Sequence, residues 1–450
     1  MGQRQDRGRA EEGLSRDTIF ALSTAPGRAG IAVVRVSGPA AMRALEALTG
    51  KPPPVPRNVT MAGFFDGQGN LIDRGLAIFF RAPASFTGED VAEFHVHGGR
   101  AIVEGLFEAL AALGLRPAGA GEFTRRAVEN GKLDLTQAEA IADLVDAQTS
   151  AQRRQALRQY DGVLSELYEG WRADLIRASA WAEAAIDFSD EELPADTLAQ
   201  ARESVSRIIK EIQRHMDDSS RGEILREGLH LTVIGPPNAG KSSLVNALAR
   251  RDVAIVAETA GTTRDVIEVR MDLGGYPVTI ADTAGLRHAA EAVEAEGVRR
   301  AFARAEAADL VLLLLDGSAA APAAGLPKAM RADLVVFNKA DLPWPAKRDG
   351  LAISLRTGAG VDAMIDALTE KVRERLERPT EAPALTRKRH RHALEEAVRS
   401  LEHALAAPDD QPELMAEDLR LALRSIGRIT GRVDIEDVLD VVFREFCIGK

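Results

Sequence analysis

The sequence predicts a multidomain protein that combines two α/β domains with an all-α helical bundle. Strand-like and helix-like runs alternate from residue 18 to about residue 130, which is typical of an α/β domain. Amphipathic helical segments, with apolar residues three and four positions apart, continue to about Arg226 and return after Pro383. Between these helical parts, a glycine-rich loop joins a strand-like run to a helix-like run, which predicts a second, inserted α/β domain.

The N-terminal α/β domain is predicted at residues 17–130. Its expected strands and helix, separated by turns rich in proline and glycine, are residues 31–36, 75–80, 91–96 and 100–113. Residues 1–16 are polar and charged and have no apolar core, so we expect a disordered extension rather than a signal peptide.

The helical domain is predicted in two parts, residues 131–227 and residues 377–450, on either side of an inserted domain at residues 228–376. Thr136 and Glu139 form a capping-box pattern near the start of the first part. Insertion of one domain into another succeeds where the ends of the inserted domain are close together. We therefore expect a change in the inserted domain to be felt in the helices.

Residues 235–242 read GPPNAGKS and form a complete phosphate loop after the strand-like residues 231–234. Backbone N–H groups of such a loop point at the α and β phosphates of a nucleotide, and its lysine reaches the β and γ oxygens. The serine hydroxyl that follows the lysine can ligate Mg²⁺. The contacts expected from this loop are those of Asn238, Ala239, Gly240, Lys241, Ser242 and Ser243.

Two later elements identify the nucleotide. One offers a carboxylate that can hold Mg²⁺ through water and a glycine N–H that can meet a γ-phosphate. Its residues are Asp282, Thr283, Ala284 and Gly285. The other element is Asn338, Lys339 and Asp341, after a strand-like run. A carboxylate only accepts hydrogen bonds, so Asp341 suits guanine, whose N1–H and 2-amino group donate. The sequence therefore predicts a Ras-like P-loop domain that binds GTP.

The residues expected to activate water for hydrolysis differ from those of small GTPases. Gly285 is followed by Leu286, where small GTPases carry a glutamine that orients the attacking water. Another polar group must therefore position the water. Glu291, Glu294 and Glu296 are the candidates just downstream, and the residues alone do not choose among them.

Three further features of the nucleotide site have open interpretations. The side-chain carbonyl of Asn238 can hold a monovalent cation such as K⁺ beside the phosphates, or it can merely shape the loop. Thr262 or Thr263 can close over Mg²⁺ as the first switch. Ser354-Leu355 stands where Ser-Ala is usual, which leaves open what that loop contributes to guanine binding.

Composition restricts where the protein works. The chain has 450 residues, a net charge of −11 and one cysteine, Cys447, so no internal disulfide can form and a reducing compartment is expected. The longest aliphatic run, residues 310–315, is far below the roughly 20 residues that a membrane span needs. We therefore expect a soluble, cytoplasmic protein whose acidic charge argues against non-specific coating of nucleic acid.

With these residues assembled, the chain resembles the bacterial tRNA-modification GTPases of the MnmE (TrmE) family from about Asp17 to Lys450. The stretches that carry the resemblance are residues 24–30 (TAPGRAG), 85–90 (SFTGED), 117 with 121–123 (P and GEF), 132–135 (KLDL), 138–142 (AEAIA), 185–188 (AIDF) and 446–450 (FCIGK). The last stretch is highly specific in a chain that also has a central phosphate loop.

The resemblance implies a homodimer whose subunits contain an N-terminal folate-binding and dimerisation domain, a helical domain and an inserted G domain. It implies a heterotetramer with a flavin-containing protein of the MnmG (GidA) type. Together they would install an aminomethyl or carboxymethylaminomethyl group on C5 of the wobble uridine of certain tRNAs, driven by K⁺-dependent pairing of G domains. The alternatives are a GTPase switch in ribosome assembly or translation, without a covalent product, and a folate enzyme that its G domain only regulates.

The resemblance also assigns roles to residues. Glu294 aligns with the family's water-orienting glutamate, and Ser242 and Thr263 align with its Mg²⁺ ligands. The implied K⁺ ligands are Asn238 and, in the first switch loop, Ala257, Thr259 and Thr262. The same loop's other implied nucleotide contacts are Ala260, Gly261 and Thr263. The implied contacts to a 5-formyl- or methylene-tetrahydrofolate are Arg35, Glu93, Lys132 and Lys450.

Two features outside the G domain have alternative interpretations. The Cys447 thiolate can attack C6 of a uracil ring and activate C5, or the residue can be a spectator. The resemblance favours a catalytic role for Cys447, so the candidate catalytic residues are Glu294 and Cys447. The basic residues 387–392 can grip a tRNA phosphate backbone or begin a solvated helix.

Overall fold

The residues described by the computed structural model are 17–187, 197–218, 220–251, 253–255, 268–281, 308–321, 331–345, 348–376 and 385–433, with Leu439, Val442, Phe443, Phe446 and Gly449. The chain divides into two compact units. The terminal unit comprises Met1–Ala142 and Arg424–Lys450, and the central unit comprises Asp143–Leu423. No helix among the described residues is long and apolar enough to cross a membrane.

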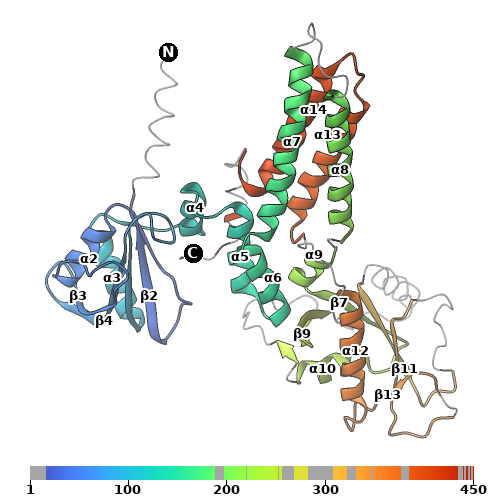
Figure 1. Ribbon diagram of the computed structural model, residues 1–450. Coiled ribbons are helices and arrows are strands. Elements are labelled where there is room, and N and C mark those ends of the chain that lie inside the picture. The colour runs from blue at the N-terminus through green and yellow to red at the C-terminus, as the bar shows by residue number, and fades with distance from the viewer. Residues whose placement is uncertain are drawn as a thin grey trace, which may run out of the picture. The chain divides into compact units, whose positions relative to one another are not determined.

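The terminal unit contains a six-stranded sheet in the order β3-β4-β5-β2-β1-β6. Figure 1 labels β2, β3 and β4 of this sheet. The strands are β1 (Ile19–Leu22), β2 (Ala29–Ser37), β3 (Thr60–Phe65), β4 (Leu71–Phe80), β5 (Val91–Gly98) and β6 (Arg116–Pro117). Neighbours pair antiparallel except β1 and β6, which are parallel. The three predicted strands are confirmed as β2, β4 and β5, and the predicted helix is α3 (Arg100–Ala112).

One face of this sheet packs against α3 and α2 (Ala41–Thr49). The residues of β2 alternate, so that Val34 and Val36 are fully buried and Arg35 between them is partly exposed. Because successive side chains of a strand point to opposite faces, the valines join the helix-covered core and Arg35 lies on the other face.

Two helices follow the sheet, α4 (Glu122–Glu129) and α5 (Leu135–Asp146). The capping box predicted at Thr136 and Glu139 is wrong, because the N-cap lies two residues earlier, at Asp134. Asp134 Oδ1 accepts from the Gln137 N–H at 2.9 Å, and Gln137 Oε1 accepts from the Asp134 N–H at 3.1 Å. Aspartate is preferred over threonine as an N-cap, so Asp134 takes the cap and Thr136 lies within the first turn.

Residues from the C-terminal end of the chain complete the terminal unit. Leu439, Val442, Phe443 and Phe446 form a hydrophobic cluster with Leu135 and Ala138 of α5. The rings of Phe443 and Phe446 lie 5.0 Å apart between centroids. The terminal unit is therefore built from both ends of the sequence.

The central unit contains a seven-stranded sheet in the order β13-β12-β11-β7-β10-β9-β8. The strands are β7 (Leu229–Ile234), β8 (Ala254–Ile255), β9 (Glu268–Leu273), β10 (Tyr276–Ala281), β11 (Leu310–Asp316), β12 (Leu334–Asn338) and β13 (Leu351–Ala352). The strands from β13 to β10 pair in parallel, and β9 and β8 continue the sheet antiparallel. Helices α10 (Lys241–Ala249) and α12 (Val361–Leu376) share one hydrophobic core with the sheet.

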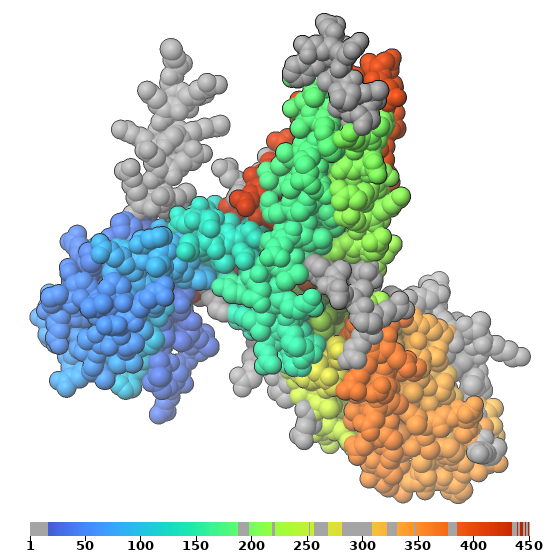
Figure 2. All heavy atoms as spheres, in the orientation of Figure 1, coloured from blue at the N-terminus to red at the C-terminus, as the bar shows by residue number. Residues whose placement is uncertain are grey.

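Long helices form the rest of the central unit. They are α6 (Ser150–Tyr160), α7 (Val163–Asp187), α8 (Thr197–Asp218), α9 (Ser220–Glu227), α13 (Lys388–Ala406) and the first part of α14 (Pro412–Thr430). The two green helices α7 and α8 lie against each other along much of their length (Figure 2). His215 of α8 packs edge-on against the rings of Tyr168 and Trp171 of α7, at centroid distances of 5.8 Å and 5.5 Å.

Candidate functional site

The phosphate loop lies between β7 and α10, as the sequence predicted. Two glycines allow its path. A Cβ on Gly235 would lie 2.0 Å from the carbonyl oxygen of Leu314 on β11, and a Cβ on Gly240 would lie 2.5 Å from Nδ2 of Asn338. Gly240 also has a φ of +103°, which residues with side chains rarely adopt. Only glycines therefore let the loop run this close to β11 and to the end of β12.

The polar groups of the loop suit an anion. Lys241 Nζ donates to the carbonyl oxygens of Gly235 at 2.8 Å and Pro236 at 2.9 Å, so the ammonium group lies over the start of the loop. Ser242 and Ser243 are in the first turn of α10, where free backbone N–H groups and the helix dipole attract phosphate. The arrangement fits the phosphates of a nucleotide.

Asn338 joins the phosphate loop to the loop that follows β13. Its side chain is buried, its Nδ2 donates to the Ala239 carbonyl at 2.9 Å, and its Oδ1 accepts from the Leu355 N–H at 3.1 Å. The neighbouring Lys339 pairs its Nζ with Asp316 Oδ2 at 2.5 Å. The structure therefore brings Asn338 to the phosphate loop, where it holds the loop in place, whereas Lys339 is paired with the last residue of β11.

The Asp341 carboxylate meets the same loop after β13. Its Oδ1 accepts from Ser354 Oγ at 2.6 Å, and its Oδ2 pairs with Arg356 Nε at 3.0 Å. The hydrogen bond from Ser354, helped by the charge of Arg356, holds the pKa of Asp341 below its usual value. The carboxylate is thus an acceptor, as guanine recognition requires. Both Ser354 and Leu355 contact predicted guanine residues, so leucine in place of alanine does not remove this loop from the site.

Several predicted residues lie outside the described part of the chain. They are residues 1–16 and Ala257, Thr259, Ala260, Gly261, Thr262, Thr263, Asp282, Thr283, Ala284, Gly285, Glu294, Cys447 and Lys450. Their roles stay predictions. In the sequence, the first switch residues precede β9 and Asp282 directly follows β10, so the two segments are joined by one hairpin.

A second polar site lies on the face of the terminal sheet opposite α2 and α3. Arg35 on β2 and Glu93 on β5 are register partners, and Arg35 Nε and Nη2 lie 3.0 Å and 2.9 Å from Glu93 Oε1. Glu93 Oε2 lies 3.1 Å from His95 Nε2. The guanidinium of Arg35 lies over the rings of Phe86 and Phe123, 5.6 Å and 5.9 Å from their centroids. Two of the predicted folate residues are therefore in direct contact beside aromatic rings.

The C-terminal end of the chain is fixed to the same sheet. Ser23 Oγ donates to the carbonyl oxygen of Gly449 at 3.0 Å. Gly449 has a φ of +101°, and a Cβ there would lie 2.1 Å from the carbonyl oxygen of Leu22. Leu22 ends β1, beside the β1 residue that pairs with Arg35. Lys450 lies outside the described residues, but the residue before it is held at the edge of the Arg35 site.

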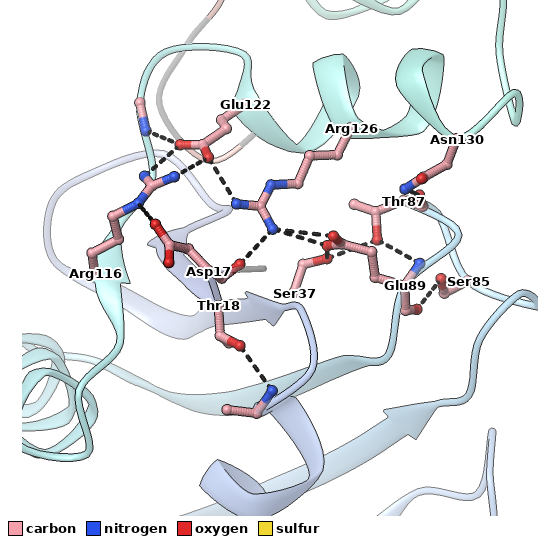
Figure 3. Close-up of polar contacts among 12 residues, drawn as sticks. Asp17, Thr18, Ser37, Ser85, Thr87, Glu89, Arg116, Glu122, Arg126 and Asn130 are labelled. Carbon is pink, nitrogen blue, oxygen red and sulfur yellow. Dashed lines mark hydrogen bonds and ion pairs between the residues drawn. The ribbon is translucent and has the colours of Figure 1, made fainter. Parts of the chain in front are cut away.

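Sequence reasoning missed an ion-pair network in the terminal unit, shown in Figure 3. The buried Arg126 of α4 donates to the two carboxylate oxygens of Glu89 at 3.2 Å and 3.1 Å, to Glu122 at 3.0 Å and to the Asp17 carbonyl at 2.8 Å. Arg116 donates to both oxygens of Glu122, at 2.9 Å and 2.6 Å. Three separate segments are thereby joined around one buried guanidinium.

The network fixes the loop that lies over the Arg35 site. Burial alone would raise the pKa of Glu122, but hydrogen bonds from two arginines and from the Gly119 N–H outweigh burial and lower that pKa to about 2. Glu89 also accepts from Ser37 Oγ at 2.7 Å. Glu89 belongs to the loop of residues 85–90, and Phe86 of this loop covers Arg35. The contacts of Glu89 therefore hold this loop in place.

Lys132 lies against the same loop. A Cβ on Gly88 would be 3.2 Å from Lys132 Cγ, and Asn130 Nδ2 donates to the Thr87 carbonyl at 2.7 Å. The signal for the network was present in the sequence, because Glu89 lies in the stretch SFTGED and the glutamate of α4 lies in GEF.

The basic residues 387–392 do not form one exposed surface. Arg387 Nη2 pairs with Asp143 Oδ1 at 2.7 Å and its side chain is 12% exposed. His390 is fully buried, and Arg391 pairs with a glutamate of α9 at 3.4 Å. The RNA-gripping interpretation is therefore wrong for Arg387, whose charge is already paired within the fold.

These features define a P-loop GTP-binding protein with an inserted nucleotide-binding sheet. They are a phosphate loop after a parallel strand, the acceptor Asp341, and helices that precede and follow the sheet in the sequence. The profile described as the MnmE helical domain matches residues 135–447. The profile described as the GTP-binding protein TrmE N-terminus matches residues 18–132.

Curated relatives match almost the whole chain, and each carries the name tRNA modification GTPase MnmE. The protein of Parvibaculum lavamentivorans is 56% identical over 438 residues, which cover 96% of this chain and 100% of that protein. The proteins of Paramagnetospirillum magneticum and Rhodospirillum rubrum are 55% and 54% identical over 442 and 461 residues, covering 96% and 97% of this chain and 100% of each relative. The chain belongs to the MnmE family.

Proposed function

We propose that this protein hydrolyses GTP to drive tRNA modification. With a flavin-containing partner of the MnmG (GidA) type, a homodimer of the chain in the cytoplasm would install an aminomethyl or carboxymethylaminomethyl group on C5 of the wobble uridine. One observation carries the proposal: the same chain contains a guanine-type phosphate-loop site and, in its other unit, an arginine–glutamate site edged by the C-terminal residues. Relatives named tRNA modification GTPases align with both.

The phosphate loop would hold GTP by its phosphates, and Asp341 would select guanine. The N–H groups of residues 238–243 and the ammonium of Lys241 provide donors for the phosphate oxygens. Ser242 would ligate Mg²⁺ together with Thr263, and the ion would neutralise charge that develops on the phosphates during transfer to water. Asp341 would accept from N1–H and the 2-amino group, which adenine lacks in this arrangement.

Hydrolysis also needs an oriented water and a second positive charge. We assign the water to Glu294 and the charge to K⁺, held by Asn238 and by the loop residues Ala257, Thr259 and Thr262. Asn238 has a φ of +63°, a conformation that asparagine tolerates better than most residues, so the residue also shapes the loop. Equal GTP turnover in KCl and NaCl would leave only that shaping role.

The terminal unit would bind 5-formyl- or methylene-tetrahydrofolate. Arg35 and Lys132, with Lys450, supply cations for an anionic folate tail, and Glu93 supplies an acceptor for the pterin edge. The phenyl rings over Arg35 offer an apolar wall beside these charges. Cys447 would act as the nucleophile at C6 of uracil. Two residues further on, Gly449 is held against β1 of the same sheet.

The deciding experiment combines the protein with its flavoprotein partner, unmodified tRNA, GTP, KCl and methylene-tetrahydrofolate. The tRNA is then digested and its nucleosides are weighed. A mass gain on uridine confined to the wobble position, and absent with the Asp282→Asn protein, is the expected result. GTP hydrolysis without a mass gain, in the presence of active partner, would favour a switch in ribosome assembly or translation.

A further inference from the structure

The central unit has a second polar cluster where the chain enters and leaves the inserted sheet. Arg226 is the penultimate residue of α9, just before β7, and Arg387 directly precedes α13, after the sheet and α12 are complete. Both arginines bind one carboxylate oxygen on α5. Asp143 Oδ1 lies 2.9 Å from Arg226 Nε and 2.7 Å from Arg387 Nη2. We call the two chain segments at Arg226 and Arg387, which connect the inserted sheet to the helices, the two crossings. The Asp143 side chain is 14% exposed, so a largely buried carboxylate holds the two crossings together.

Three glutamines of α6 strengthen the same connection. Gln152 Nε2 donates to the Arg226 carbonyl at 3.1 Å, and Gln155 Nε2 donates to a carbonyl of α9 at 3.1 Å. Gln159 Oε1 accepts from Thr386 Oγ1, next to the returning crossing, at 3.1 Å. Residues spaced by three and four positions share one face of a helix, so α6 turns this whole face toward the crossings.

The N-terminus of α6 also contacts the nucleotide-binding sheet. The Ala151 N–H donates to the carbonyl of Gly275, in the turn between β9 and β10, at 3.0 Å. A Cβ on Gly275 would lie 2.6 Å from Ser150 Oγ, so the turn and the helix leave no room between them. In the sequence, this hairpin joins the predicted switch residues 257–263 to the predicted γ-phosphate residues 282–285.

We propose that Asp143 is a positioning residue that transmits the nucleotide state of the G domain to the helical part. The argument rests on the proposed GTPase function. By holding both crossings against α5 and α6, Asp143 keeps the β9–β10 hairpin docked on α6. A movement of the hairpin then moves α6 as well. Without this hold, the inserted domain could rotate about its two connections and leave α6 in place. Ligand binding shifts an equilibrium only through contacts that differ between two states, and the docked hairpin is such a contact.

A polar cavity beside this contact gives the hairpin room to move. It has a volume of about 360 Å³ and is lined by residues of α5, α6, β9 and β10, among them Asp143, Gln152, Arg270 and Thr279. The hairpin therefore touches α6 at its turn but is separated from it along part of its length. Such a geometry permits two arrangements of the same contact, as transmission requires.

The test uses Asp143→Asn, which keeps the side-chain shape and removes the charge. Asp146→Asn is the matched control, because Asp146 is an exposed carboxylate on the same helix and lines the same cavity. Amide hydrogen exchange of the peptide 148–160 is compared between the GDP-bound protein and the protein bound to a non-hydrolysable GTP analogue. The wild type and the control should show a nucleotide-dependent difference, and Asp143→Asn should lose it.

Enzymatic readouts separate positioning from support of the fold. For Asp143→Asn, kcat and KM for GTP hydrolysis should stay within about twofold of the wild type. Modified uridine formed per GTP hydrolysed should fall by about tenfold, which is within the usual range of coupling between two sites. Asp143→Glu, which keeps the charge, should recover most of the exchange difference.

Two results would overturn the proposal. One is a wild-type exchange difference in Asp143→Asn, and the other is a parallel loss of GTP hydrolysis and modification, which would mark Asp143 as a support of the fold. If Asp143→Asn does not fold, Arg387→Gln leaves the Arg226 pair in place and is judged by the same results. The exchange measurement needs no tRNA product, so failure of wild-type modification would refute the proposed function while exchange still decides the role of Asp143.

Discussion

Replacing Glu122 with glutamine should destabilise the terminal unit at neutral pH. Burial of Glu122 alone would raise its pKa, but the hydrogen bonds from Arg116, Gly119 and Arg126 lower the pKa from 4.5 to about 2. At about 1.4 kcal/mol for each pKa unit, this depression corresponds to at most about 3 kcal/mol of folding free energy, and solvent screening of the partly exposed carboxylate reduces that value. Glutamine keeps an acceptor for the arginines, so about 3 kcal/mol is the upper end of the expected loss.

The sign of the pH dependence follows from the direction of the pKa change. Because the folded-state pKa of Glu122 lies below the unfolded value, its contribution is fully present above about pH 4.5 and is lost as the pH falls toward 2. The wild type should therefore lose this contribution between about pH 5 and pH 2. Glu122→Gln lacks the titrating group, so its stability should converge with that of the wild type near the lower pH.

Fluorescence cannot follow this change, because Trp171, Trp181 and Trp344 all belong to the central unit. A multidomain chain also lacks one defined unfolding transition. Hydrogen exchange of β2 and β5 peptides in increasing urea reports on the terminal unit directly. The control is Glu129→Gln, since Glu129 pairs with Arg125 at 2.9 Å on the surface of the same helix and should contribute only about 0–1 kcal/mol. Equal losses in both variants, or an unchanged pH slope in Glu122→Gln, would refute the reasoning.

Three further predictions concern the two sites. Asn338→Ala leaves one buried and one partly buried backbone partner without their bonds, at about 1–3 kcal/mol, so the Kd for GTP in titration calorimetry should rise about 10–100-fold. Asp341→Asn should shift preference from GTP to XTP in competition binding, because an amide donates to the 2-carbonyl of xanthine; retained GTP preference would contradict the assignment. Gly449→Val would collide with the Leu22 carbonyl and should weaken tetrahydrofolate binding in equilibrium dialysis while GTP turnover is unchanged. Undiminished folate affinity would separate the C-terminal residues from that site.

The sequence predicted those features whose information is local. The strand β2 was predictable because apolar residues alternate around Arg35, and the phosphate loop because its residues are contiguous. Asp341 was predictable from chemistry, since only an acceptor suits the guanine edge. Arg35 and Glu93 are predicted as folate contacts from the family resemblance alone, and the structure adds that they are paired in direct cross-strand register.

Features that depend on competition or on distant segments were not predictable. Thr136 and Asp134 both stand where an N-cap can be, and only the bond from the Gln137 amide shows which one takes the position. Arg126 meets Glu89 and Asp17 across 37 and 109 positions of sequence, which no periodicity reveals. The charge of Arg387 looked available for RNA because its partner, Asp143, is 244 positions away.

The order of the two units along the chain has a physical explanation in loop-closure entropy. Gly121 of the N-terminal segment lies so close to Phe443 and Phe446 that a Cβ would be 2.8 Å and 2.9 Å from their atoms, although the whole central unit separates them in sequence. Each doubling of an intervening loop costs only about 0.6 kcal/mol, whereas burying one phenylalanine contributes about 1.5–3 kcal/mol. Two buried rings therefore offset the insertion of a large domain.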